Sequence, residues 1–201
     1  MIRSWRGRPA KAGASAKARG GNSIVISAMI LGLVFLNPCA ARASAKTAGG
    51  SDVPLFTIAK SENKNEVQYA VHVDEHCVPI AGAPVFAYWR MLELGPTKVA
   101  PILPREVSAY GVASQNATSQ GGTGGTARVV LHAMPTRPIV VETARASNGA
   151  CRAVATVTIA GAPAHLFNVY VKLKEVLGVD YLLVRGWSLD GTKMLTEKLK
   201  K

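Results

Sequence analysis

The sequence is poor in acidic residues, in cysteine, and in glycine and proline. Its 201 residues include 12 Asp and Glu against 24 Lys and Arg, three Cys, 19 Gly and 11 Pro. The glycine and proline content is too low for a collagen-like chain, and 48% hydrophobic residues are too many for a disordered one. A net charge of +12 favours a nucleic-acid or anionic-membrane partner only if the basic residues belong to the folded domain.

The sequence also lacks the motifs of the common catalytic classes. It contains no Gly-x-Ser-x-Gly nucleophile elbow, and the Gly-rich stretch 121–126 lacks the Gly-Lys-Ser/Thr ending of a phosphate-binding loop. None of the 12 carboxylates forms a paired motif of the kind that glycoside hydrolysis uses. These absences predict no cofactor and disfavour an enzyme.

The excess of positive charge is concentrated at the N-terminus. Residues 1–43 contain seven basic residues and no acidic residue, and the 14 residues from Ser23 to Leu36 carry no charge. A basic segment, a short apolar run and an Ala-x-Ala site predict a signal peptide over residues 1–43, cleaved after Ala43 or Ala45. The alternative is an uncleaved anchor, but as a helix the run spans only about 21 Å of a hydrocarbon core of about 30 Å.

Cleavage changes the charge and the cysteine count of the chain. Loss of residues 1–43 leaves 17 basic and 12 acidic residues, a net charge of +5, with four lysines at positions 193, 198, 200 and 201. This mild charge disfavours nucleic acid as a partner. Cys39 leaves with the signal, and Cys77 and Cys151 remain as a candidate disulfide in the periplasm or outside the cell. The alternative is two unrelated buried thiols.

The rest of the chain has the pattern of an all-β protein. Short runs of β-branched and aromatic residues alternate with turn-forming clusters, and Val67, Tyr69, Val71 and Val73 alternate with polar or small residues. This predicts an antiparallel β-sandwich or partly closed β-barrel of about eight to nine strands. The predicted strands are 55–59, 66–73, 85–92, 127–133, 139–143, 150–160, 165–171, 181–189 and 193–198.

The strand pattern also sets the predicted domain boundaries. Residues 44–53 are small and polar, which is typical of a flexible leader, and residues 54–201 are predicted to form a single β-domain. Within this domain, residues 114–126 are predicted to be a Gly-rich surface loop.

One cluster has the composition of a metal site. His72, Asp74 and His76 project to one face if the chain is extended, and two imidazoles with a carboxylate can bind zinc, copper or iron. The alternative is that His72 and Asp74 are ordinary solvent-facing residues of a strand whose other face contains Val71 and Val73.

Three further stretches resemble a known family. They are a Leu-Phe-x-Ile-x-Lys-Ser-x-Asn-x-Asn segment from Leu55, the pair Tyr88-Trp89, and Ala109-Tyr110-Gly111. Their order resembles the bacterial family called domain of unknown function 4833, over roughly residues 54–198. Lys60 stands where the family pattern has Arg, so a bidentate carboxylate clamp is not expected there. The resemblance implies domain identity and no reaction.

The matching residues suggest a ligand site, because aromatic walls with a few polar groups are the usual composition of small-molecule pockets. The candidate binding residues are Lys60, Asn63, Asn65, Tyr88, Trp89, Arg105 and Tyr110. The alternative is that the aromatic residues are core and the polar ones stabilise turns.

The expected function is a non-catalytic binding or structural module that is exported to the periplasm or secreted. The alternative is an extracytoplasmic enzyme, metal-assisted through His72, Asp74 and His76, or acting through Lys60, Arg105, Glu106 and Tyr110. The sequence names no partner.

Overall fold

The computed structural model describes residues 50–60, 64–119, 121–174 and 179–200. The chain divides into two units, Met1–Ala43 and Ser44–Lys201, and all described residues belong to the second. The predicted signal peptide, its two cleavage sites and residues 44–49 of the predicted leader therefore lie outside the described residues.

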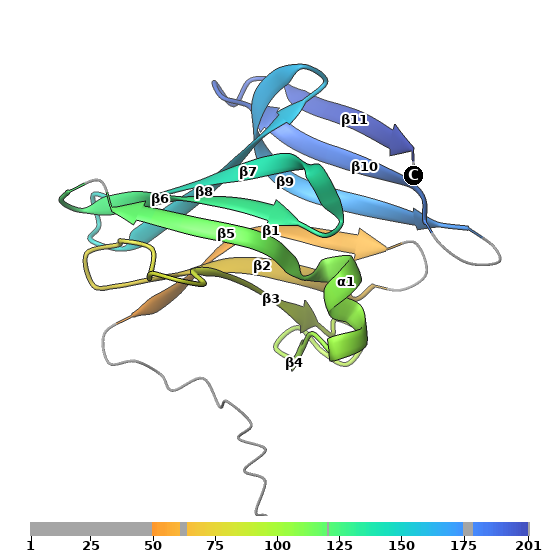
Figure 1. Ribbon diagram of the computed structural model, residues 1–201, viewed down its shortest axis with the longest axis horizontal. Coiled ribbons are helices and arrows are strands. Elements are labelled where there is room, and N and C mark those ends of the chain that lie inside the picture. Colours follow the sequence, from red (N-terminus) through yellow and green to blue (C-terminus); the bar gives the residue numbers. More distant parts are fainter. Residues whose placement is uncertain (1–49, 61–63, 120, 175–178, 201) are drawn as a thin grey trace, which may run out of the picture. The chain divides into compact units, whose positions relative to one another are not determined.

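The described residues form an almost purely β structure, as predicted (Figure 1). The elements are β1 (Ser51–Lys60), β2 (Glu66–Val73), β3 (Val85–Arg90), β4 (Val99–Pro101), η1 (Pro104–Glu106), α1 (Val107–Tyr110), β5 (Val112–Ser119), β6 (Gly124–Leu131), β7 (Met134–Arg145), β8 (Cys151–Ile159), β9 (Ala162–Leu173), β10 (Val179–Ser188) and β11 (Met194–Lys200). Each of the nine predicted strands overlaps an observed one, and β2 has the predicted ends. β4 and β5 were not predicted, so the predicted count of eight to nine was too low.

All eleven strands belong to one mixed sheet. Its main path runs β4-β3-β2-β1-β9-β8-β7-β6-β5, and β10 pairs with the other edge of β9 and with β11. The prediction of a purely antiparallel sheet was wrong at one place, because β1 and β9 are parallel. A parallel pair joins segments far apart in sequence, and no turn signal marks it.

Strand β9 divides one of its edges between two partners. Residues Ala162–His165 pair with β8, and residues Asn168–Val171 pair with β1. At the changeover, Asn168 donates from Nδ2 to Thr57 Oγ1 over 2.9 Å. The sheet therefore bends back on itself and encloses a core between its two arms, β1–β4 and β5–β8.

Inward-facing residues of both arms fill this core. Alternate positions of β2 and β7, such as Val67, Tyr69, Ile139 and Val141, are completely buried. In β7 this burial follows the alternation of strand side chains, whereas in β2 the intervening Gln68 and Ala70 are buried as well.

The sheet is not closed into a barrel. β4 pairs only with residues Tyr88–Arg90 of β3, and the described residues form no ladder between β3 and β5. Instead, the Val85 N–H donates to Gln115 Oε1 over 2.8 Å, and Gln115 Nε2 donates to the Val85 carbonyl over 3.1 Å. One side-chain amide of β5 thus satisfies both backbone groups of a buried β3 residue.

Two segments predicted to be irregular are strands. Ser51–Val53, placed in the flexible leader, pair with β2, where Asp52 lies opposite His72. Most of the predicted Gly-rich loop 114–126 lies in β5 and β6. The polar residues of this segment suit β5, because β5 is an exposed edge strand. Gly124 is needed in β6 because a Cβ at this position would lie only 2.3 Å from the Thr143 carbonyl oxygen of β7. Composition alone cannot separate such strands from loops.

Cys77 and Cys151 form a disulfide. Their Cα atoms are 5.3 Å apart and their sequence separation is 74 residues. The bond ties the turn after β2 to the start of β8, and so connects the two arms of the sheet across the core. Cys77 is completely buried there.

We expect reduction of Cys77–Cys151 to destabilise the fold by about 4 kcal/mol, because the bond closes a long loop in the unfolded chain. Urea denaturation of the oxidised protein and of the same protein held reduced would measure the difference. An unchanged midpoint would contradict the predicted role of the bond.

We also expect Gln115→Ala to lower the free energy of unfolding by about 1–3 kcal/mol, because the backbone groups of buried Val85 lose their partner. Asn116→Ala, on the opposite side of the same strand, is the matched control and should have little effect. Equal losses in the two variants would show that Gln115 does not join the arms.

Candidate functional site

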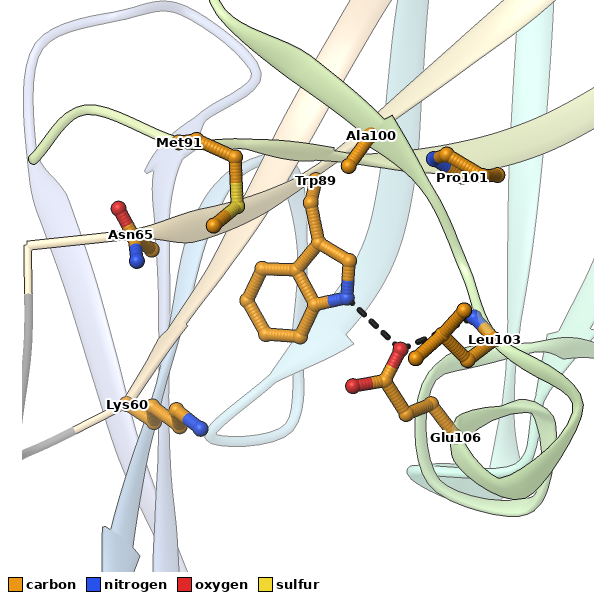
Figure 2. A pocket seen from close by; sticks show the side chains of 8 residues that line it. All are labelled: Lys60, Asn65, Trp89, Met91, Ala100, Pro101, Leu103 and Glu106. Atoms are coloured by element: carbon orange, nitrogen blue, oxygen red, sulfur yellow. Dashed lines mark hydrogen bonds between the residues drawn. The ribbon is translucent and has the colours of Figure 1, made fainter. Parts of the chain in front are cut away.

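A pocket lies where the inward-facing residues of β1–β4 end. Lys60 lies two residues after buried Ile58, and Asn65 lies two residues before buried Val67. Strand alternation therefore directs both side chains to the side of the sheet that faces the core. The pocket has a volume of about 280 Å³ and opens to solvent. Figure 2 shows its lining: Lys60, Asn65, Trp89, Met91, Ala100, Pro101, Leu103 and Glu106.

Trp89 forms the floor of the pocket. Trp89 is only 8% exposed, and its ring and the Tyr110 ring pack in a T-shaped arrangement with centroids 5.3 Å apart. The indole Nε1–H donates to Glu106 Oε2 over 3.0 Å. The ring is thus held by an aromatic contact and by a hydrogen bond where it lines the pocket.

Glu106 is positioned by the short helical turn η1. Its Oε2 also accepts the Leu103 N–H over 3.0 Å, so the carboxylate closes the turn that carries it. Burial raises the pKa of Glu106, but the bonds from Leu103 and Trp89 and the charges of Arg105 and Lys60 outweigh it and lower the pKa below its ordinary value. The carboxylate is therefore ionised at neutral pH.

Only one oxygen of this carboxylate is occupied by its neighbours. The bonds from Trp89 and Leu103 both reach Oε2, and Oε1 accepts no hydrogen bond from the residues that the structure describes. An ionised oxygen at the pocket wall can accept an N–H or O–H from a bound molecule.

Lys60 supplies the positive charge of the pocket. Its Nζ lies 5.5 Å from the centre of the Trp89 ring, a cation–π distance. Among the described residues it forms no salt bridge. The pocket thus combines an ammonium group, a carboxylate oxygen and an aromatic surface.

Asn65 closes the pocket beside Met91. Its Nδ2 donates to Glu93 Oε2 over 3.3 Å, and its Oδ1 accepts the Glu93 N–H over 3.1 Å. This pair links the start of β2 to the turn that follows β3. The buried amide of Asn65 therefore shapes the pocket as well as lining it.

The structure brings together only some of the predicted binding residues. Lys60, Asn65 and Trp89 line the pocket, and Tyr110 lies behind the indole. Burial and then the charge of Glu106 raise the pKa of Tyr110, which is consistent with a supporting position.

Three predicted residues are not placed in this pocket. Tyr88 stacks on Phe86, with ring centroids 6.0 Å apart, on the opposite side of β3 from Trp89. Arg105 is exposed and reaches the site only through its charge on Glu106. Asn63 lies outside the described residues.

The predicted binding residues do not include Glu106 or most of the apolar residues that line the pocket. Strand alternation indicates Met91, two positions after Trp89, but Ala100 and Pro101 belong to the short strand β4, which was not predicted, and Leu103 lies in the connection between β4 and η1. Glu106 lies three residues after Leu103, the spacing at which an acidic side chain returns to the start of a helical turn.

The predicted metal triad is not assembled. His72 Nδ1 lies 2.5 Å from Asp52 Oδ1, whereas Asp74 Oδ1 accepts the N–H groups of His76 and Val78, each over 2.8 Å. Asp74 thus closes the turn after β2. In the described part of the chain, no three His, Cys, Asp or Glu side chains are grouped as metal ligands.

The family resemblance is confirmed by comparison with known proteins. A family model described as Domain of unknown function (DUF4833) matches residues 56–198, so the chain belongs to this family. No curated protein and no solved structure matches the chain. The matched residues include every residue that lines the Trp89 pocket.

We expect Glu106→Gln to remove one step from the acid dependence of stability. The lowered pKa of Glu106 stabilises the fold above the ordinary value of about 4.3, and this contribution is lost as the pH falls through the folded-state pKa. Urea denaturation and Trp fluorescence between neutral and acid pH would show the difference. Glu142→Gln, at an exposed carboxylate, is the control, and identical profiles for wild type and Glu106→Gln would contradict the assignment.

Proposed function

We propose that this protein is an exported, non-catalytic β-domain that binds a small amphipathic ligand over Trp89. The observation that carries the proposal is the combination in one pocket of an indole floor, an ammonium group without a salt bridge to the described residues, and a partly unoccupied carboxylate.

Export to the periplasm or beyond is supported by two features. Residues 1–43 have the composition of a signal peptide, and the Cys77–Cys151 disulfide suits an oxidising compartment. No helix among the described residues is long and apolar enough to cross a membrane.

The size and lining of the pocket suggest the kind of ligand. A volume of about 280 Å³ lies just below the range of about 300–1,000 Å³ for ligand sites, so the ligand would be small. Met91, Ala100, Pro101 and Leu103 offer apolar contact in the same pocket as the two charges. A compact molecule with an apolar body, an anionic group for Lys60 and a hydrogen-bond donor for Glu106 fits this arrangement.

An extracytoplasmic enzyme acting through Lys60 and Glu106 is the second candidate, since the pocket brings these opposite charges together. The lowered pKa of Glu106 makes it a poor proton donor at neutral pH, and its Oε2 is already used to close η1 and to hold Trp89. The same geometry suits a fixed binding group, which favours the non-catalytic role.

A thermal-shift screen of small metabolites and metal ions on the purified protein would test this proposal. A ligand at 100 times its Kd stabilises the fold by about 2.7 kcal/mol, so hits will raise the Tm. We expect Lys60→Met to abolish the shift caused by an anionic hit, and Lys98→Met, at an exposed lysine of the turn between β3 and β4, to preserve it.

The outcomes of the screen separate the candidates. Hits that survive both Lys60→Met and Glu106→Gln bind elsewhere and would overturn the pocket assignment. Turnover of a hit by wild type, lost in Glu106→Gln, would favour the enzyme.

A further inference from the structure

The outer side of β9, β10 and β11 carries a regular set of side chains that the Trp89 pocket does not use. The opposite side of these strands is core, where Leu182, Val184, Val169 and Val171 are buried. The strand registers define four cross-strand rows on the outer side: Lys172–Tyr181–Lys200, Tyr170–Leu183–Lys198, Asn168–Arg185–Thr196 and His165–Trp187–Met194. We call these twelve residues the basic aromatic face.

The charge of this face has one sign. It contains Lys172, Arg185, Lys198 and Lys200, and none of its twelve residues is acidic. Lys198 Nζ lies 3.9 Å from the centre of the Tyr181 ring, so its charge is held over the sheet. Asp180 borders the face at the bulge before Tyr181.

The carboxylate of β11 does not neutralise these cations. Glu197 alternates to the other side of the strand, where it forms a bidentate pair with Arg137 over 2.5 and 2.7 Å. It also accepts the Ala160 N–H over 2.6 Å. Lys198 and Lys200, two of the C-terminal lysines, thus belong to a surface that the carboxylate of Glu197 does not face.

Large apolar side chains are exposed at one end of the face. Trp187 is 40% exposed and Met194, directly opposite it, is 47% exposed. Leu189, in the turn after β10, and Phe167, the extra residue in the bulge of β9 beside this row, are exposed by more than half. Four of the nine exposed large apolar residues in the described part of the chain therefore lie at one end of this cationic surface.

We propose that the basic aromatic face docks on an anionic lipid surface. Cations near such a surface are attracted to its phosphate groups, and Trp and Tyr rings reside favourably at the level of the headgroups. A soluble polyanion would pair with the lysines, but it would leave Leu189, Met194 and Phe167 in water. Burial of these side chains together with neutralisation of the cations favours lipid.

Vesicle binding by the purified protein would test the proposal. We expect binding to vesicles that contain phosphatidylglycerol, no binding to phosphatidylcholine vesicles, and weakening by salt. Each cation contributes roughly fivefold, so Lys198→Gln with Lys200→Gln should weaken binding about tenfold to thirtyfold. Lys64→Gln with Lys98→Gln removes the same charge elsewhere and should leave the affinity nearly unchanged.

A Trp187→Ser variant tests insertion separately from charge. Quenching of fluorescence by brominated lipid should be strong in the wild type and largely lost in this variant, while melting temperatures confirm that every variant is folded. Equal weakening by both lysine pairs, absence of vesicle binding, or binding to polyphosphate but not to vesicles would each overturn the proposal. Each readout is independent of ligand binding over Trp89.

Discussion

One edge of β9 pairs with two strands, β8 and β1, and the rest of the structure depends on this double pairing. Each N–H and C=O along a buried strand needs a partner, and β8 satisfies only the first part of β9. The parallel pairing with β1 satisfies the second part and so joins the arm β1–β4 to the same edge of β9 as the arm β5–β8. The bulge at Phe167 and the Asn168–Thr57 hydrogen bond mark the point where the partner changes.

The pocket is a consequence of this pairing. Lys60 is the last β1 residue in register with β9, opposite Val171, so its backbone is fixed at the end of the enclosed core. Trp89 lies at the same end of the core because β2 pairs with both β1 and β3, and in the β2–β3 pairing Val67 is opposite Trp89. The ammonium group and the indole therefore meet through a ladder of four strands, although 29 positions separate them in the sequence.

The strands that could be predicted from the sequence are those with a clear local pattern of alternating apolar residues. Glu66–Val73 alternates clearly and was predicted with its correct ends, but β5 is polar because it is an edge strand, and the three-residue β4 is too short for any period. Lys60, Asn65 and Trp89 were found through the family resemblance. Glu106 was missed as a binding residue because its place depends on the turn that it closes and on an indole from another strand.

The two proposed surfaces use opposite sides of one sheet. Val171 faces the core as the partner of Lys60, whereas Lys172, the next residue, belongs to the outer rows. Because strand side chains alternate, adjacent residues of β9 face opposite sides: one pairs with the β1 residue that lines the pocket, and the next belongs to the basic aromatic face. Docking through the outward side chains would use none of the residues that line the Trp89 pocket, so the two proposed interactions do not compete for the same side chains. A domain held at a lipid surface with a free pocket would meet its ligand there at a raised local concentration if that ligand is itself amphipathic.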